Sequence, residues 1–406
     1  MAITIIQTPN EVNLAQSPII FAVSESNSNA FTSSSFQYLA ELRYWTGSLT
    51  DSASVADYTL SKYPNASRTG IFDVSRIINS ELSDIVQAVS SSVRYVAIDA
   101  YTQFLSGSTF VTGSHVVSDV YSAIDGYSLF QEPITQEIEQ KTPFWPIMTQ
   151  GPTSQSYQEG TGGRMSIWSG ARDGGAPQVS ALIYSTSLAG EDNNYEFPTG
   201  SNNSREQVHT FPISPSEPDW PLGTDLLNFE IFAISGSNNY NGSNRINERL
   251  HFDYVCDTKY DNIRIKWKNR FGQFDYYNFN LVSKESMSTQ RQRYQPQIGS
   301  WNERGLSYEK FENSVQNYIV DSKQNLSVNS NYLPESYNDI FKELMVSDEV
   351  YWVQSYKTPP AAKDPGESLM PLAVQSSNFN IKTTKVDKLI QYQFDFIRGQ
   401  GFKLII

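Results

Sequence analysis

The sequence predicts a mainly β protein built from several β-sandwich-like domains with few short helices. Aromatic residues make up 13% of the chain, with 24 Tyr and 22 Phe, and aromatic and β-branched side chains favour pleated, half-buried surfaces. Apolar and polar residues alternate with period 2 in several segments, which Ser, Asn and Gly clusters separate. Only two segments show convincing helical spacing, so strand should exceed helix by at least about two to one.

The first module, residues 1–130, is expected to form an Ig-like β-sandwich. In residues 36–44 the even positions are apolar and the odd positions are mostly polar, which indicates a half-buried strand. Residues 18–23 and 93–98 are two further expected strands. Between them, Asp73 stands as a helix cap before apolar residues at helical spacing, which predicts one short helix.

The middle module, residues 131–250, is expected to be a loop-rich β-domain. Residues 143–146 and 212–221 are dense in proline and contain tryptophan. The short apolar runs 179–184 and 229–234 fit strands between long loops. Such long loops often belong to functional or interface segments.

The C-terminal module, residues 251–406, is expected to be a β-rich assembly domain. Residues 263–281 alternate around a central turn, which predicts a β-hairpin whose Gly272 adopts positive φ. Residues 334–345 carry apolar side chains on one helical face, with Pro334 at the favoured first position. Residues 390–396 alternate again and predict a closing strand.

Charge and composition exclude several function classes. The 406 residues suggest two or three domains, and the net charge is −13. Residues 1–255 carry a net charge of −15 and residues 256–406 carry +2. An acidic chain lacks the basic footprint of a general nucleic-acid binder. The single Cys rules out an internal disulfide framework and a Cys-based zinc site.

The start of the sequence lacks the basic residues and long apolar core of a secretion signal. The longest apolar stretch, residues 18–23, is far short of the ~20 residues that cross a bilayer. We therefore expect folding in a reducing cytoplasm and no membrane insertion.

The motif search predicts no catalytic, cofactor-binding or metal-binding residues, and thus no enzyme. The sequence contains no phosphate-binding loop, no His-Glu-x-x-His and no Gly-x-Ser-x-Gly. His115, His209 and His251 are far apart in sequence, and Cys256 fits a buried, inert thiol. Paired carboxylates leave a β-sandwich hydrolase open as a rival, and Asp/Asn-rich loops such as residues 192–194 leave Ca²⁺ binding open.

Four aromatic residues are candidates for an interface or for stacking on glycan rings, because they fall in segments expected to be loops. The alternative is that these rings fill cores that are short of leucine, and the composition favours it. The four candidates are Trp145, Trp168, Trp220 and Tyr240.

One segment has a recognisable pattern. Residues 256–279 read Cys, then Tyr260, then Trp-x-Asn-x-x-Gly-x-x-Asp-Tyr-x-x-Phe from Trp267 to Phe279. This pattern resembles a hairpin in uncharacterised β-rich virion structural proteins of tailed bacteriophages. Residues 333–351 and 388–396, together with 17–23 and 70–77, look like the same group.

The resemblance touches the first and last modules and leaves the middle uncovered. It departs from some relatives at Gln273, which follows the turn glycine, and in the long loop 355–370. It implies no catalytic residues and no cofactor.

The resemblance implies a structural protein of the virion, in the tail, baseplate or fibre region. Its expected partners are other virion proteins and copies of itself in a homo-oligomer. The alternatives are a glycan-binding receptor-recognition protein, whose partner is a host surface glycan, and a capsid decoration or neck protein. Assembly is expected to depend on the C-terminal module, while the acidic N-terminal part faces outward or meets a different partner.

Overall fold

The protein is mainly β, with two helices among the residues that the computed structural model describes. The expected fold class is thereby confirmed. The described residues are 3–10, 12–26, 31, 35–46, 57–82, 90–91, 93–127, 154–157, 163–169, 179–185, 195–198, 207–213, 228–235, 250–254, 259–297, 299–307, 309, 315–335, 337–356, 367–376 and 389–399.

The chain divides into two compact units, and each is described by itself. The first unit comprises Met1–Cys256, Lys268–Tyr276 and Tyr356–Glu367. The second comprises Asp257–Trp267, Tyr277–Ser355 and Ser368–Ile406. The division into 1–130, 131–250 and 251–406 stays a prediction.

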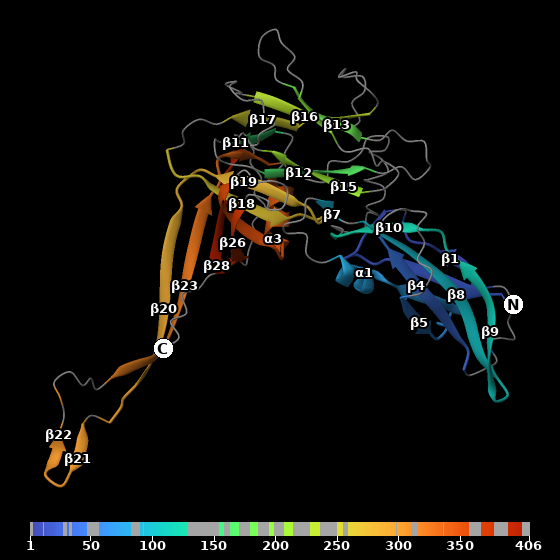
Figure 1. Ribbon diagram of the computed structural model, residues 1–406, viewed down its shortest axis with the longest axis horizontal. Helices are drawn as coiled ribbons and strands as arrows, with labels where there is room; N and C mark the ends of the chain where they lie inside the picture. The colour runs from blue at the N-terminus through green and yellow to red at the C-terminus, as the bar shows by residue number, and fades with distance from the viewer. Residues whose placement is uncertain are drawn as a thin grey trace. The chain divides into compact units, whose positions relative to one another are not determined.

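Two sheets at the start of the first unit pack face to face as a β-sandwich (Figure 1). One has the order β1 (Ile3–Gln7), β3 (Ile20–Glu25), β6 (Thr69–Asp73). The other has the order β2 (Val12–Leu14), β10 (Tyr121–Ile124), β8 (Arg94–Ser106), β4 (Gln37–Trp45), β5 (Tyr58–Lys62), and β9 (Thr109–Val117) also pairs with β8. All pairs are antiparallel except β2 with β10.

The sandwich core follows from the alternation in β4. Tyr38, Ala40 and Leu42 are fully buried and pack against Phe21 and Phe72 of the opposite sheet. The predicted strand over 36–44 and its inward even positions are therefore confirmed.

The short helix α1 (Ser75–Glu81) lies where the sequence places it, but its cap differs. The N-cap residue is Val74, and no side chain caps it. Asp73 stands one residue earlier, and its carboxylate accepts hydrogen bonds from the Ser75 and Ile19 amides at 3.0 and 3.2 Å. The aspartate therefore ties the helix start to the strand β3 region.

The backbone of the middle region forms two further sheets. One has the order β11 (Ser154–Tyr157), β17 (Leu250–Tyr254), β16 (Asn228–Ser235), β13 (Val179–Ser185), β14 (Tyr195–Pro198). The other has the order β12 (Gly163–Ser169), β15 (Gln207–Ile213), β7 (Ser90–Ser91). The expected strands at 179–184 and 229–234 are β13 and β16.

Most residues of one seven-stranded sheet belong to the second unit. Its order is β19 (Phe274–Phe279), β18 (Ile263–Lys268), β25 (Val350–Tyr356), β26 (Glu367–Val374), β28 (Gln393–Arg398), β23 (Gln316–Asn329), β20 (Lys284–Tyr294). Two small pairs accompany it, β21 (Ser300–Asn302) with β22 (Gly305–Ser307) and β24 (Leu333–Pro334) with β27 (Leu389–Ile390).

Helix α3 (Tyr337–Val346) covers this sheet with its apolar face. Phe341 is fully buried, and its ring centre lies 5.1 Å from that of Phe394. The sequence placed the helix start at Pro334, but that residue belongs to β24 and the helix begins three residues later. The other predicted apolar positions, Leu344 and Ile340, do face the core.

One further expectation needs correction. The strand expected over 390–396 is interrupted at Tyr392, whose backbone amide binds the Ser330 hydroxyl at 2.9 Å. The basic residues of β18 do not face water: Lys266 is fully buried and Arg264 is 9% exposed. Arg264 donates a hydrogen bond from Nη1 to Asn278 Oδ1 at 2.8 Å. Strand β18 is thus covered on both faces, which the alternation of charge and apolar residues did not suggest.

Candidate functional site

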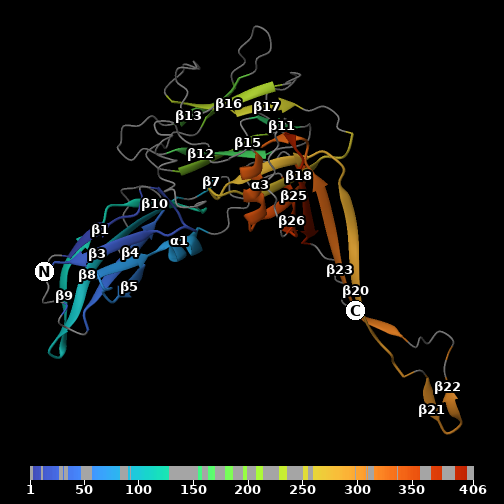
Figure 2. The same cartoon turned by 180° about the vertical axis from the view of Figure 1, so that it is seen from behind.

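The most unusual surface of the second unit is an arm formed by β20 and β23. The two strands pair without interruption from Lys284 with Ser327 to Gln292 with Ile319, and then from Arg293 with Asn317. Strand β28 pairs with β23 only from Asn325 to Asn329. The rest of the ribbon therefore continues beyond the sheet (Figures 1 and 2), and β21 and β22 lie past its far end.

The arm buries little of its own surface. Every residue of β20 is exposed except Thr289, which is half-buried. Exposed large apolar residues cluster on the arm and its tip: Met287, Tyr294, Leu306, Val315, Tyr318 and Ile319. A two-stranded ribbon without a covered face is marginally stable in water. Contact with another surface would therefore stabilise the arm.

Aromatic and amide side chains stiffen the outer part of the arm. A bulge in β23 inserts Tyr318 opposite the step from Gln292 to Arg293. The Tyr318 and Tyr294 rings meet edge to face at 6.1 Å. Tyr294 donates to Gln316 Oε1 at 2.8 Å, and Tyr318 donates to Gln292. These contacts hold the two strands together without covering them.

A polar groove of about 1000 Å³ lies at the base of the arm. Its lining residues come from β20, β23 and β28 and from the end of β26: Lys284, Glu285, Ser286, Asn325, Leu326, Ser327, Gln375, Ser376, Gln393 and Asp395. Arg398 Nη1 and Glu285 Oε2 form an ion pair at 3.0 Å. The Arg398 guanidinium lies 5.2 Å from the centre of the Trp352 ring. The groove is lined by hydroxyl, amide and charged groups, which suits a polar partner.

A second candidate lies on the outer face of the N-terminal sheet. The His115 Nδ1 atom lies 3.1 Å from Asp99 Oδ1, and the His115 ring stacks on Tyr101 at 4.5 Å. Arg43 Nη2 lies 3.6 Å from Asp99 Oδ2, and the Tyr101 hydroxyl lies 3.5 Å from Glu41 Oε1. Burial, and next the Glu41 charge, raise the pKa of Tyr101 above its ordinary value.

An aspartate that orients a histidine is the arrangement of a general base. His115 sits on an open sheet face, with its side chain 48% exposed, and not in a water-excluding cavity. Catalytic sites normally shield the reacting group in a concave pocket. The arrangement fits a surface hydrogen bond better than a reaction centre.

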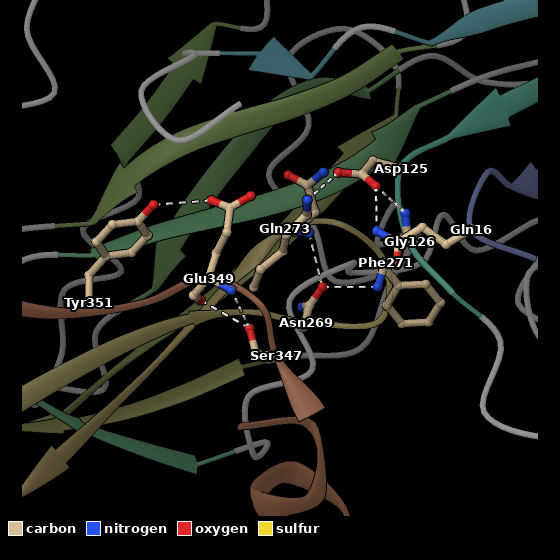
Figure 3. A network of polar contacts seen from close by, with 10 residues as sticks. Gln16, Asp125, Gly126, Asn269, Phe271, Gln273, Ser347, Glu349 and Tyr351 are labelled. Atoms are coloured by element: carbon tan, nitrogen blue, oxygen red, sulfur yellow. Dashed lines mark hydrogen bonds and ion pairs between the residues drawn. The ribbon is translucent and has the colours of Figure 1, made fainter. Parts of the chain in front are cut away.

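Hydrogen bonds from the backbone to one side chain hold the predicted hairpin turn between β18 and β19. Gly272 has φ of +71°, as its sequence position requires. The Asn269 side-chain oxygen accepts from the backbone amides of Phe271 and Gln273, both at 3.0 Å (Figure 3). Within the first unit, the Tyr127 amide donates to the Arg270 carbonyl at 2.7 Å.

The turn also supplies an apolar contact. Phe271 is buried against Val12, Leu14, Tyr95 and Ile124. The tip of the hairpin therefore packs in the core of the first unit. We interpret the sequence pattern of this turn as a requirement of folding and not as a binding site.

The sequence-predicted aromatic candidates are not brought together by any described contact. Trp168 lies in β12, opposite Val208 of β15, and not on a loop as expected. The other three candidates, Trp145, Trp220 and Tyr240, lie outside the described residues, as do Cys256 and the Asp/Asn-rich loop 192–194.

His209 lies in β15 and His251 in β17, on separate sheets. Within the described part of the chain, no group of three or more His, Cys, Asp or Glu residues is placed to hold a metal ion. No helix among these residues is long and apolar enough to cross a membrane.

Sequence reasoning missed the arm. Its residues show no apolar face, so the alternation that revealed the other strands is absent. The usable signal was the lack of glycine and proline between residues 284 and 294.

Comparison with known proteins found no matching family model and no match among curated proteins.

Proposed function

We propose that this chain is a structural protein of a bacteriophage virion, in the tail, baseplate or fibre region, that works by protein–protein assembly and has no catalytic activity of its own. The observation that carries the assembly part is the β20–β23 arm. It extends past its sheet and exposes both apolar side chains and strand edges. Extended strands with exposed edges bind other chains by adding to their sheets.

The place in a virion is supported by the resemblance of residues 256–279 to β-rich tail-associated proteins. The charge distribution supports the same role. The nearly neutral C-terminal part can lie against a crowded partner, whereas the −15 net charge of residues 1–255 disfavours contact between like copies there.

Deleting the arm tests this proposal. The paired residues Ser286 and Asn325 can be joined by Asn-Gly in place of residues 287–324, because a two-residue Asn-Gly turn closes an antiparallel pair. The variant should keep its fold by circular dichroism, because the removed residues contribute little to the buried core. It should be lost from particles when it is the only copy supplied to producing cells.

Alanine replacement of Tyr63, a 71% exposed residue of the first unit, is the matched control and should be incorporated normally. Normal incorporation of the armless variant would refute the assembly role of the arm. Turnover on a polysaccharide panel that disappears with His115→Ala would refute the non-catalytic role.

A further inference from the structure

We infer that the free edge of β20 pairs with β20 of a second copy, antiparallel about a two-fold axis at Thr289. This inference rests on the proposed assembly function and names the partner of the arm. It follows from the free edge, from the register that the strand allows with itself, and from the charges which that register brings together.

The first step is that β20 has an open edge. It is the last strand of the seven-stranded sheet, so among the described residues only β23 pairs with it. The open edge runs over all eleven residues of Lys284–Tyr294, about 35 Å at the usual rise of a strand. A long exposed edge is a template for another strand unless the protein blocks it. Strand β20 contains no proline and no bulge, because the bulge at Tyr318 lies on β23.

The second step concerns register. In a strand, the backbone N–H and C=O groups of every second residue point to the same edge. When two identical strands pair antiparallel along that edge, two residues that face each other must both be odd-numbered or both be even-numbered. The two-fold axis therefore lies on a residue and not between two residues. An axis on Thr289 uses the whole strand, because residues 284 and 294 are equally distant from it. Thr289 is also the residue of β20 that is least exposed.

The third step is charge. With the axis on Thr289, Glu285 of each copy lies opposite Arg293 of the other, and no like charges face each other. Opposite charges directly across an antiparallel pair stabilise it, and like charges destabilise it. The other cross-strand partners are Lys284 with Tyr294, Ser286 with Gln292, Met287 with Arg291 and Ser288 with Gln290.

Neighbouring registers are worse. An axis on Gln290 sets Arg293 opposite Met287 and removes both charge pairs. An axis on Ser288 sets Glu285 opposite Arg291 but leaves Arg293 and Tyr294 beyond the end of the partner strand. The register at Thr289 is therefore the one that uses every residue and both charge pairs.

The paired arms explain two other features. Four strands in place of two give the ribbon the size that independent stability requires. The register also brings Arg293 and Tyr294 of the partner copy beside Glu285 and Lys284, which line the polar groove at the base of the arm.

Site-directed cross-linking tests the register. In a full-length Cys256→Ser background, which is free of other thiols, Thr289→Cys places two thiols on the proposed axis. Oxidation to the disulfide, or a short bis-maleimide that alkylates both thiols, should convert most of the protein to a covalent dimer. Met287→Cys and Arg291→Cys should not cross-link alone, but a mixture of the two should give a heterodimer. Covalent dimers from Met287→Cys or Arg291→Cys alone, or no dimer from Thr289→Cys, would overturn the inference.

Charge reversal tests the pairing independently. Arg293→Glu should raise the dimer dissociation constant roughly tenfold or more, because it creates two like-charge pairs per dimer. Glu285→Arg combined with Arg293→Glu should restore it to within about threefold when all variants are compared in an Arg398→Gln background, because Arg398 otherwise lies 3.0 Å from the side chain of residue 285. The matched control is Lys323→Glu, an exposed charge on β23, which should leave dimerisation unchanged. Equal loss in the single and double reversals would overturn the pairing.

The two failures are distinguishable. If the armless variant no longer assembles but Thr289→Cys gives no dimer, the arm binds another surface, and only the self-pairing is wrong. If the armless variant assembles normally, the assembly role itself is wrong.

Discussion

The Lys268 ammonium lies 2.6 Å from the Asp125 carboxylate, and their side chains are only 13% and 5% exposed. The same carboxylate accepts hydrogen bonds from the Gly126 amide at 2.7 Å and from Gln16 Nε2 at 3.1 Å. Lys268 begins the turn whose Phe271 fills the neighbouring apolar cluster. The ion pair thus links Lys268 and Asp125, which are distant in sequence, within the first unit. A simple cut of the chain at residue 255 would remove both Lys268 and Phe271 from this unit, so it would disturb folding as well as assembly.

Asp125→Asn should destabilise the protein by about 3 kcal/mol, because it removes the carboxylate charge that lies 2.6 Å from the buried Lys268 ammonium. Urea unfolding should show a lower midpoint with the same slope. The control is Asp339→Asn, which removes an exposed partner of Lys342 at 2.9 Å and should cost less than about 1 kcal/mol. Equal losses in the two variants would show that the Asp125 pair contributes no more than a surface contact.

Gly272→Ala should be more costly than Gly107→Ala. Both glycines have nearly the same φ, +71° and +66°, so the backbone strain of an L-residue is the same. A Cβ on Gly272 would lie 2.7 Å from the Asp125 Cβ and backbone oxygen, whereas a Cβ on Gly107 meets nothing within 4 Å. Gly107→Ala should cost about 1 kcal/mol and Gly272→Ala at least 1 kcal/mol more. Identical midpoints in thermal unfolding would contradict the close approach.

Short-range patterns in the sequence predicted several elements correctly. The burial of Tyr38, Ala40 and Leu42 and the positive φ of Gly272 follow from alternation and turn chemistry, which act over a few residues. Pairings set by tertiary packing could not be predicted. The Asp99–His115 contact depends on the register of β8 with β9, including its bulge.

The burial of charged side chains could not be predicted from the sequence either. Lys266 alternates with apolar residues as a solvent-facing lysine would, but a strand covered on both faces buries it. The arm was missed for the opposite reason, since a strand such as β20 with no buried face leaves no apolar periodicity to detect.

Phe341→Ala should strongly destabilise the second unit. The Phe341 ring is fully buried and lies 4.9 to 6.1 Å from the rings of Tyr392, Phe394 and Phe279. Its removal leaves a cavity under the helix and should cost about 3–5 kcal/mol. Val346→Ala, on the same helix but 60% exposed, is the control and should change stability by less than about 0.5 kcal/mol. A loss below 1 kcal/mol for Phe341→Ala in urea unfolding would show that α3 does not pack on the sheet as described.

Stability should fall at alkaline pH because two tyrosines of the second unit resist ionisation. Burial raises the pKa of Tyr337 to about 12, and burial followed by the neighbouring Tyr337 charge raises the pKa of Tyr277 further. Between the ordinary pKa of 10.0 and the raised values, the unfolded state loses these protons while the folded state keeps them. The stabilisation is therefore complete below pH 10 and is lost as the pH rises, by up to about 1.4 kcal/mol per pH unit for each group.

Urea unfolding at pH 9, 10 and 11 measures this slope, and absorbance of tyrosinate follows the same titration. Tyr337→Phe should reduce the fall of the unfolding free energy with pH by the contribution of one tyrosine, because phenylalanine cannot ionise in the folded or the unfolded state. The unchanged protein, unfolded in urea over the same pH range, is the reference for this slope. A slope that Tyr337→Phe does not alter would mean that this phenol titrates alike in the folded and unfolded chain, which is incompatible with its burial between Tyr277 and Phe341.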